Sequence, residues 1–220
     1  MGISGNPGRL IGSGRASDVY ELGEGWVLRR DREEYGDGVA EAALLGRLHA
    51  LGHPVPRVRP ADCTRTELVM ERLHGPTMLE AFCAGRIGPR EAGETLARLL
   101  RRLHALPGRV IHLDLHPDNV LLTADGPHDI DRTNAEEGEP ALDRGMSALI
   151  LAQVAVVDAQ LSEPVRATPA ALLADPSDLT GRALGEARRR RAANPTMTAR
   201  EVEALGEAEQ LVRSFTDGER

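Results

Sequence analysis

A polar loop between two short apolar runs carries the residue types that phosphoryl transfer needs. Asp114 is followed five positions later by Asn119, and Asp131 comes twelve residues after that. A carboxylate at Asp114 can accept the proton of an attacking hydroxyl or orient it, and the amide oxygen of Asn119 can bind Mg²⁺. A second carboxylate, at Asp131, can bridge the ion to the β- and γ-phosphates, because Mg²⁺ prefers oxygen ligands and takes few of them from the protein. The spacing predicts transfer from a Mg²⁺-bound nucleoside triphosphate, although Asp and Asn are also common in ordinary loops.

A glycine-rich stretch near the N-terminus could cover the phosphates of such a nucleotide. Residues 11–20 read IGSGRASDVY, in which two glycines flank a serine. Glycines permit a close approach of the backbone and leave N–H groups for phosphate oxygens. The pattern alone also fits a plain hairpin turn. The candidate cofactor-binding residues of this stretch are Gly12, Ser13, Gly14 and Val19.

Taken whole, the string HLDLHPDNVLL at residues 112–122 resembles the catalytic loop of aminoglycoside phosphotransferases and of their choline- and homoserine-kinase relatives. Ile130-Asp131 resembles the start of their metal-binding segment, and residues 11–20 resemble their glycine-rich strand–turn–strand. The resemblance runs from Ile11 to about Phe215. It implies a two-lobed, protein-kinase-like fold of the α+β class that moves the γ-phosphate of ATP or GTP to a small-molecule hydroxyl acceptor. The three oxygen-bearing side chains would keep the roles given above, catalysis by Asp114 and Mg²⁺ binding by the other two.

The same resemblance assigns the groups that steady the phosphates. The run WVLRR at residues 26–30 lies where the family has the strand with its phosphate-binding lysine, which places Arg29 at that position. The chain contains no lysine, and an arginine keeps the charge on a bulkier, forked head. Arg30 could share the role. Glu41 would be the ion-pair partner of this cation, with a solvated helix carboxylate as the alternative interpretation.

Residues 68–76, LVMERLHGP, resemble the hinge between the two lobes of the family. The backbone around Glu71 and Leu73 would hydrogen-bond the adenine edge, with Val69 or Met70 beside the base. Backbone groups matter more than side chains in such a hinge, so the sequence does not distinguish ATP from GTP.

The segment around Asp131 departs from the family pattern. His128-Asp129 places polar residues in a strand that is usually apolar, and Arg132 stands beside a metal ligand. Buried polar groups and a nearby positive charge can both weaken Mg²⁺ binding. The alternative function is therefore a pseudokinase that holds a nucleotide with little or no transfer. Only a short stretch separates Asp131 from Pro140, without an Ala-Pro-Glu motif, which argues against a kinase acting on proteins.

Other polar groups of this region admit two interpretations each. Asp143 either braces the catalytic loop or is a plain acid at a helix start. The acidic residues Glu136, Glu137 and Glu139 either attract a cationic, amine-bearing acceptor or belong to a solvated loop. A zinc site formed by His112, His116 and His128 is a further alternative, but Pro117 keeps this loop from being a helix with two imidazoles on one face.

The spacing of apolar residues predicts a β-rich first part and a helical second part. Residues 1–73 are expected to form a nucleotide-binding lobe, a five-stranded antiparallel sheet with one helix. Residues 74–220 are expected to form a helical lobe with the catalytic loop and the acceptor site. The predicted strands are Arg9–Ile11, Asp18–Leu22, Trp26–Arg30, Pro56–Ala61 and Glu67–Leu73, with brief apolar runs at Arg109–His112 and Asn119–Leu122. The predicted helices span positions 39–51, 96–103, Pro140–Gln160, Asp178–Ala193 and Thr198–Phe215.

The amino-acid composition limits the kinds of partner that we expect the chain to bind. A net charge of −7 and an aromatic content of 2% argue against nucleic acid, which needs a basic face or stacking rings. No apolar run approaches the roughly 20 residues of a membrane helix, and the N-terminus lacks the apolar core of a signal peptide. We therefore expect no membrane association and a cytoplasmic location. The two cysteines predict no disulfide framework, and the sequence leaves open whether the chain is a monomer or a dimer.

Overall fold

The computed structural model describes residues 8–14, 16–32, 36–157, 162–174 and 179–217. The chain divides into two compact units. The first unit comprises Met1–Gly75 with Leu121–Thr133, and the second comprises Pro76–Val120 with Asn134–Arg220. The assignment of nucleotide binding to residues 1–73 and of the acceptor site to residues 74–220 stays a prediction.

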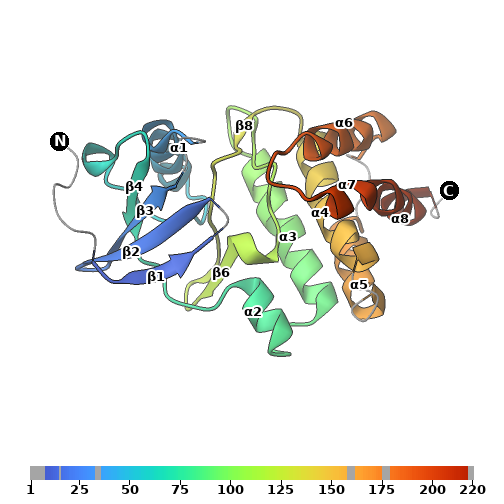
Figure 1. Cartoon of the computed structure of the whole chain (residues 1–220), viewed down its shortest axis with the longest axis horizontal. Coiled ribbons are helices and arrows are strands. Elements are labelled where there is room, and N and C mark those ends of the chain that lie inside the picture. Colours follow the sequence, from blue (N-terminus) through green and yellow to red (C-terminus); the bar gives the residue numbers. More distant parts are fainter. Residues whose placement is uncertain (1–7, 15, 33–35, 158–161, 175–178, 218–220) are drawn as a thin grey trace. The chain divides into compact units, whose positions relative to one another are not determined.

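A four-stranded antiparallel sheet, in the order β1-β2-β3-β4, forms the basis of the first unit (Figure 1). Its strands are β1 Leu10–Ser13, β2 Ser17–Gly23, β3 Trp26–Asp31 and β4 Glu67–Glu71. Gly23-Glu24-Gly25 joins β2 to β3 with three successive positive φ angles, which glycine adopts without a Cβ clash. β3 is an inner strand, and Val27, Leu28 and Arg29 are all buried in it.

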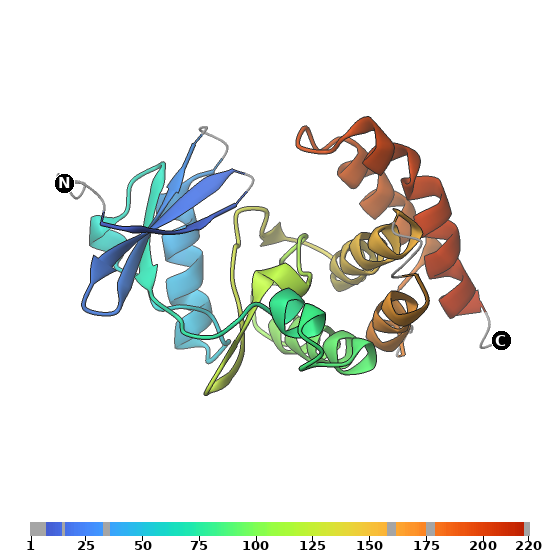
Figure 2. The same cartoon turned by 60° about the horizontal axis from the view of Figure 1, so that its bottom comes forward.

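One α-helix, α1 Gly38–Ala50, lies against this sheet (Figure 2). The Asp37 carboxylate caps its first turn by accepting hydrogen bonds from the N–H groups of Val39 and Ala40, at 3.0 and 3.1 Å. Such a cap satisfies N–H groups that have no partner inside the helix. The apolar side chains of Leu45 and Leu48 are buried against the sheet side, and the predicted helix at positions 39–51 is confirmed.

The prediction of a fifth strand at Pro56–Ala61 is wrong. Only an isolated bridge between Val58 and Met70 occurs there, and Pro60–Asp62 forms a short 3₁₀ helix, η1. Proline lacks a backbone N–H and cannot donate to a strand ladder, and the prolines of this stretch therefore prevent continuous pairing.

A short hairpin, β6 Val120–Thr123 with β7 Gly126–Asp129, follows residues 112–119, the loop predicted to be catalytic and called the catalytic loop below. Gly126 lies at its turn, with a φ of 110°. Apart from Val120 the hairpin belongs to the first unit. Gly75 permits its close packing, since a Cβ on that residue would lie 2.1 Å from the carbonyl oxygen of Leu122.

The second unit is mainly helical. Its helices are α2 Met78–Cys83, α3 Pro89–His104, α4 Pro140–Val157, α5 Ser162–Leu172, α6 Gly181–Ala192, α7 Ala199–Glu203 and α8 Leu205–Asp217. The predicted apolar stripe of α3 is buried, with Leu96, Leu100 and Leu103 at 1% exposure or less. Two short strands pair in an antiparallel ribbon: β5 Val110–Ile111, directly before the loop, and β8 Glu136–Glu137, after the β6–β7 hairpin.

The helix α4 is the apolar centre of the second unit. Its 18 residues have the length and hydropathy of a membrane span, but 72% of that stretch is buried inside the structure, as is typical of a core helix. It contacts α5, α6 and α8. The predicted range Pro140–Gln160 agrees with α4 up to Val157, and residues 158–160 lie outside the described part.

Two helical predictions need correction. The single helix expected at Thr198–Phe215 is broken at Ala204 into α7 and α8, although it begins where predicted, with a capping box between Thr198 and Glu201. The sequence also did not predict α2 or α5, because α2 is only six residues long and α5 carries Pro169 inside it. The fold class itself is confirmed: an antiparallel sheet with one helix, then a mainly helical region, as in protein-kinase-like folds.

Candidate active site

The catalytic loop of the second unit is anchored by a buried carboxylate. Asp143, in the first turn of α4, accepts hydrogen bonds from the backbone N–H groups of His112 and Leu113, at 2.8 and 2.7 Å. His104 of α3 contacts the same carboxylate at 2.8 Å. Burial alone would raise the pKa of Asp143, but the hydrogen bond from His104 and the neighbouring charges outweigh it and lower the pKa. Asp143 is therefore an anion that holds the loop, and the interpretation as a plain helix-start acid is wrong.

Within the loop the backbone turns sharply, with Leu113 in the left-handed region at a φ of 63°. The turn brings Asp114 and Asn119 together. The Asn119 amide nitrogen donates to the Asp114 carbonyl oxygen at 2.9 Å and lies 3.4 Å from its carboxylate. The amide nitrogen thus serves the loop, which leaves the amide oxygen as the group suited to a cation. The Asp114 side chain is 29% exposed, so a solute can reach it.

Two histidines, His112 and His116, accept hydrogen bonds from backbone N–H groups of this loop. The N–H of Asp114 donates to Nδ1 of His112 at 3.3 Å, which requires the proton of that neutral ring on Nε2. Nε2 of His112 is buried and has no hydrogen-bond partner among the described residues. Burial lowers the pKa of His116 even though Asp114 lies beside it, so His116 is neutral at neutral pH. No group of three or more His, Cys, Asp or Glu side chains that could hold a metal gathers among the described residues, which removes the support for a zinc site there.

In the first unit Arg29 and Glu41 form a bidentate ion pair. The two guanidinium nitrogens donate to the two carboxylate oxygens at 2.9 and 2.5 Å, and both residues are buried. Burial alone would lower the pKa of Arg29, but Glu41 outweighs it and raises the pKa. Arg30 instead pairs with Glu67 at 2.7 Å. Of the two arginines that could hold a phosphate, Arg29 is thus the one joined to α1.

Asp131 lies beside this pair, in an unusual conformation. Its φ is 60°, a left-handed value that Asp tolerates better than most residues. Its carboxylate is 3.7 Å from Arg29 and accepts a hydrogen bond from the Thr133 hydroxyl at 2.8 Å. The next backbone N–H, that of Arg132, donates to Glu41 at 3.2 Å. With 45% of its side chain exposed, Asp131 presents a carboxylate to solvent from a fixed backbone.

The residues that depart from the family pattern are engaged with one another. Arg132 donates to the Asp129 carboxylate with both Nε, at 2.8 Å, and Nη2. His53 lies 2.7 Å from the same carboxylate and 2.9 Å from Arg132. All three side chains are at most 1% exposed. The charge of Arg132 is therefore balanced by Asp129, and the expected repulsion of a cation by Arg132 is reduced. His53 was missed because no nearby residue marks it in the sequence.

The glycine turn between β1 and β2 is closed by an ion pair. The N–H of Gly14 donates to the Ser17 carbonyl at 2.8 Å. Arg32 donates to Asp18, at 2.6 Å, and to the Gly14 carbonyl oxygen, at 3.0 Å. The hydrogen bond from Arg32 is the largest cause that lowers the pKa of Asp18 to about 2. The two predicted glycines and Ser13 lie in and beside this turn, and Val19 pairs with Gly12 and Arg29 across the neighbouring strands.

The predicted hinge residues lie at and after the end of β4. The N–H of Glu71 donates to the Arg57 carbonyl at 2.8 Å, and its carboxylate is bound by the Arg57 guanidinium at 2.9 Å. At this residue the backbone carbonyl is therefore the group left for a nucleobase. Met70 and Leu73 are half-buried nearby.

The donors present fit a Mg²⁺–nucleotide complex in kind. Asn119 offers an amide oxygen, Asp131 an exposed carboxylate, and Arg29 a charged guanidinium. Mg²⁺ in nucleotide sites takes only one or two protein carboxylates and completes its shell with phosphates and water. An amide oxygen and one exposed carboxylate are donors of the kind that this requirement names.

Comparison with known proteins shows which family the sequence resembles. Residues 7–110 match the model of the phosphotransferase enzyme family. The resemblance to that family is confirmed. Among the proteins similar to this chain, the 3-deoxy-D-manno-octulosonic acid kinase of Haemophilus influenzae (strain PittGG) is 31% identical over 146 residues, 52% of this chain and 60% of that protein. The enzyme of the same name from Actinobacillus succinogenes is 30% identical over 126 residues, 51% of this chain and 52% of that protein.

These matches have defined limits. The chain covers between about half and three fifths of the length of these two relatives. The phosphotransferase family match ends at residue 110, just before the catalytic loop. The roles of Asp114, Asn119 and Asp131 therefore rest on the residues and their geometry.

Proposed function

We propose that this chain is a kinase that transfers the γ-phosphate of ATP to a hydroxyl group of a small molecule. The arrangement of the catalytic loop carries the proposal. Asp143 fixes the backbone on the N-terminal side of Asp114, and Asn119 fixes the other side through its amide nitrogen. A solvent-accessible carboxylate on a loop held at both ends is what an orienting or proton-accepting group requires.

In the proposed reaction the acceptor hydroxyl lies against the Asp114 carboxylate. The hydroxyl oxygen forms a bond to the γ-phosphorus as the bond from that phosphorus to the bridging oxygen breaks, and ADP leaves. The hydroxyl proton passes to the Asp114 carboxylate. Arg29 steadies the phosphates while Glu41 holds its guanidinium, and the glycine turn at residues 12–14 covers the nucleotide.

Asn119 and Asp131 would hold Mg²⁺, which when bound neutralises charge on the phosphates. The backbone of residues 71–73 would contact the base, by its carbonyl at Glu71. A sugar-type hydroxyl is the favoured acceptor, because the relatives are named as kinases of an acidic sugar. Glu136 pairs with Arg190 and Glu139 with Arg109, so these acids are already neutralised, which weakens the case for a cationic amine. A cytoplasmic location is part of the same proposal.

A transfer assay tests this function directly. The purified chain is mixed with Mg²⁺, ATP and one acceptor from a panel of 3-deoxy-D-manno-octulosonic acid, kanamycin and choline. ADP release is measured together with the ³¹P NMR signal of a phosphate ester. Asp114→Asn should lower the transfer rate by about 100-fold or more, the usual contribution of a positioned base, while ATP affinity stays within about twofold. Asp118→Asn, the same change four residues along, serves as the control and should keep the rate. Equal rates for Asp114→Asn and wild type would contradict the assigned role.

One observation favours a second candidate, a nucleotide-binding pseudokinase. Three carboxylates, those of Glu41, Asp31 and Asp131, lie within 4 Å of Arg29, and the Arg29 side chain is only 6% exposed. An arginine so engaged has fewer donors to offer a phosphate. ATP binding without Mg²⁺-dependent ADP release, with every acceptor of the panel, would favour this candidate.

A further inference from the structure

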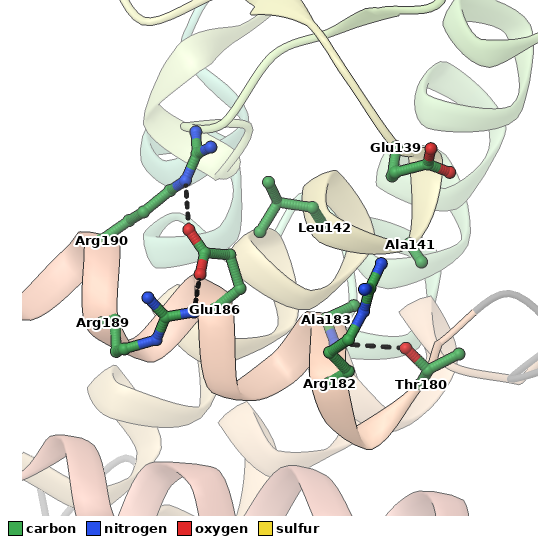
Figure 3. A pocket seen from close by; sticks show the side chains of 9 residues that line it. All are labelled: Glu139, Ala141, Leu142, Thr180, Arg182, Ala183, Glu186, Arg189 and Arg190. Atoms are coloured by element: carbon green, nitrogen blue, oxygen red, sulfur yellow. Dashed lines mark hydrogen bonds and ion pairs between the residues drawn. The ribbon is translucent and has the colours of Figure 1, made fainter.

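A pocket of about 440 Å³ lies in the second unit between the start of α4 and the helix α6 (Figure 3). Its volume falls in the range of about 300–1,000 Å³ typical of small-molecule sites. Leu142, Ala141 and Ala183 supply an apolar part of the wall. The charged lining consists of Arg182, Arg189, Arg190, Glu139 and Glu186.

The two acidic residues of the lining are neutralised by arginines. Glu186 is paired with Arg189 and, at 2.9 Å, with Arg190 (Figure 3). Glu139 is paired at 2.5 Å with Arg109, which lies just before β5. Arg190 also reaches Glu136 at 2.6 Å. The carboxylates of the wall are therefore poor partners for a cationic ligand.

Arg182 differs from the other arginines of the pocket. It has no hydrogen bond or ion pair with any part of the chain that the structure describes, and it is exposed. Figure 3 shows its side chain extending from α6 toward the part of the wall where Ala141 lies. Counting the lining with its partners Arg109 and Glu136, four arginines face three glutamates, so one positive charge remains. A guanidinium binds a carboxylate through two parallel hydrogen bonds, which suits a single unmatched arginine.

The pocket shares its walls with the elements that hold the catalytic loop. Leu142 lines the pocket, and its neighbour Asp143 binds the loop backbone. Glu136, the partner of Arg190, lies opposite Ile111 in the ribbon that leads into the loop. A ligand in this pocket is thus bound within the same unit as Asp114, on α4 and α6 next to the loop's supports.

We propose that this pocket binds a carboxylate group of the hydroxyl acceptor, with Arg182 as its main partner. That the ligand is the phosphate acceptor rests on the proposed kinase function, but its binding does not require transfer. Apolar wall residues would cover the carbon chain of such a ligand, and the paired arginines Arg189 and Arg190 would hold the pocket open. The substrate class is then a carboxylic acid that carries the hydroxyl group to be phosphorylated.

Binding is tested first, without nucleotide, on the full chain carrying Asp114→Asn so that turnover plays no part. D-Gluconate is the probe, D-glucitol is its neutral counterpart with the same number of carbons, and inorganic phosphate is a third arm. Saturation-transfer NMR titrations give each dissociation constant. D-Gluconate should bind at least about 10-fold more tightly than D-glucitol, and Arg182→Ala should remove that preference, since hydrogen bonds to charged groups are worth about that much. Arg101→Ala removes an exposed arginine of α3 outside the pocket and should change neither constant.

The outcomes separate this inference from the proposed function. No D-gluconate binding at 20 mM (roughly the affinity expected of one charged pair worth about 2–3 kcal/mol), or equal binding in Arg182→Ala, would overturn the carboxylate site even if transfer to other acceptors is found. Tighter binding of phosphate than of gluconate, lost in Arg182→Ala, would also overturn it, in favour of a phosphate site. Gluconate binding that depends on Arg182 would support the site even where the transfer assay finds no product. If a carboxylated acceptor is phosphorylated, Arg182→Ala should raise its KM about 10-fold with kcat unchanged.

Discussion

The catalytic loop and the segment that carries Asp131 each present a carboxylate to solvent, but they are held in place differently. The loop is fixed by one buried anion, Asp143, that accepts two backbone N–H groups. The Asp131 segment is fixed by side chains from far along the chain, Glu41 on α1 and His53 after it, acting through Arg132. One region depends on a single acceptor, the other on a network of charges that must stay balanced.

This contrast explains why an unusual sequence around Asp131 is compatible with an ordered site. Asp129 and Arg132 would each be costly to bury alone, because a buried charge without a partner loses its hydration. They compensate each other at full burial. The two departures from the family pattern therefore act as one structural feature, and either alone would be disruptive.

Breaking that network should have the largest effect on stability. Arg132→Met leaves the buried Asp129 without its main partner, and we expect a loss of about 3–5 kcal/mol in the free energy of unfolding. The double variant Asp129→Leu with Arg132→Met should lose less than the single one, because it removes both charges together. Urea unfolding followed by circular dichroism measures both.

Arg30→Met is the matched control for this experiment. Arg30 pairs with Glu67 in the same unit, but its side chain is 38% exposed, and half-exposed pairs contribute about 1 kcal/mol or less. An Arg132→Met variant that is no less stable than Arg30→Met would show that the network does not hold the segment.

Removing the Asp143 anion should lower the free energy of unfolding less than Arg132→Met does, but it should lower the transfer rate more. In Asp143→Asn one carboxylate oxygen becomes an amide nitrogen, which faces a backbone N–H or His104 as a second donor. We expect a loss of about 2–3 kcal/mol, the range for a buried group left unsatisfied near charge, and a lower transfer rate through displacement of Asp114. The same change at Asp125, in the exposed turn before β7, should leave both unchanged. Loss of stability with a normal transfer rate would contradict the positioning role of Asp143.

The same contrast shows how far sequence reasoning reaches. Asp114 and Asn119 lie five residues apart, and their contact follows from one local turn, so their string could be recognised directly. Arg29 and Glu41 lie on adjacent elements, and the resemblance to known kinases supplied their pairing. His53 is 76 residues from Asp129, and nothing local to either residue predicts that they meet.

The sheet and the pocket illustrate the same limit. The spacing of apolar residues located β1 to β4, but the proline-rich stretch around Val58 satisfied an apolar pattern without the N–H groups that a strand needs. For the acidic residues at 136–139 the sequence left two interpretations open, a site for a cationic acceptor or a solvated loop, because it does not show that Arg190 and Arg109 lie beside Glu136 and Glu139. The chemical role of a charged residue can be assigned only once the residues that pair with it are known.

Acid should reduce the stability that the Asp143 carboxylate adds, and this is the smallest of the predicted effects. The folded-state pKa of Asp143 lies below its ordinary value, because hydrogen bonds to His104 and the loop backbone overcome the effect of burial. A carboxyl group with a lowered pKa adds stability that is complete above its unfolded pKa, about 3.9, and is lost as the pH falls through the folded value. Between pH 7 and 5 the free-energy difference between wild type and Asp143→Asn should therefore stay constant. Below about pH 4 it should narrow, by about 1 kcal/mol for each unit of pH. Urea titrations of both proteins from pH 7 to 2.5 measure this difference. A difference that narrows already between pH 7 and 5 would contradict the assignment of this stability to the Asp143 anion.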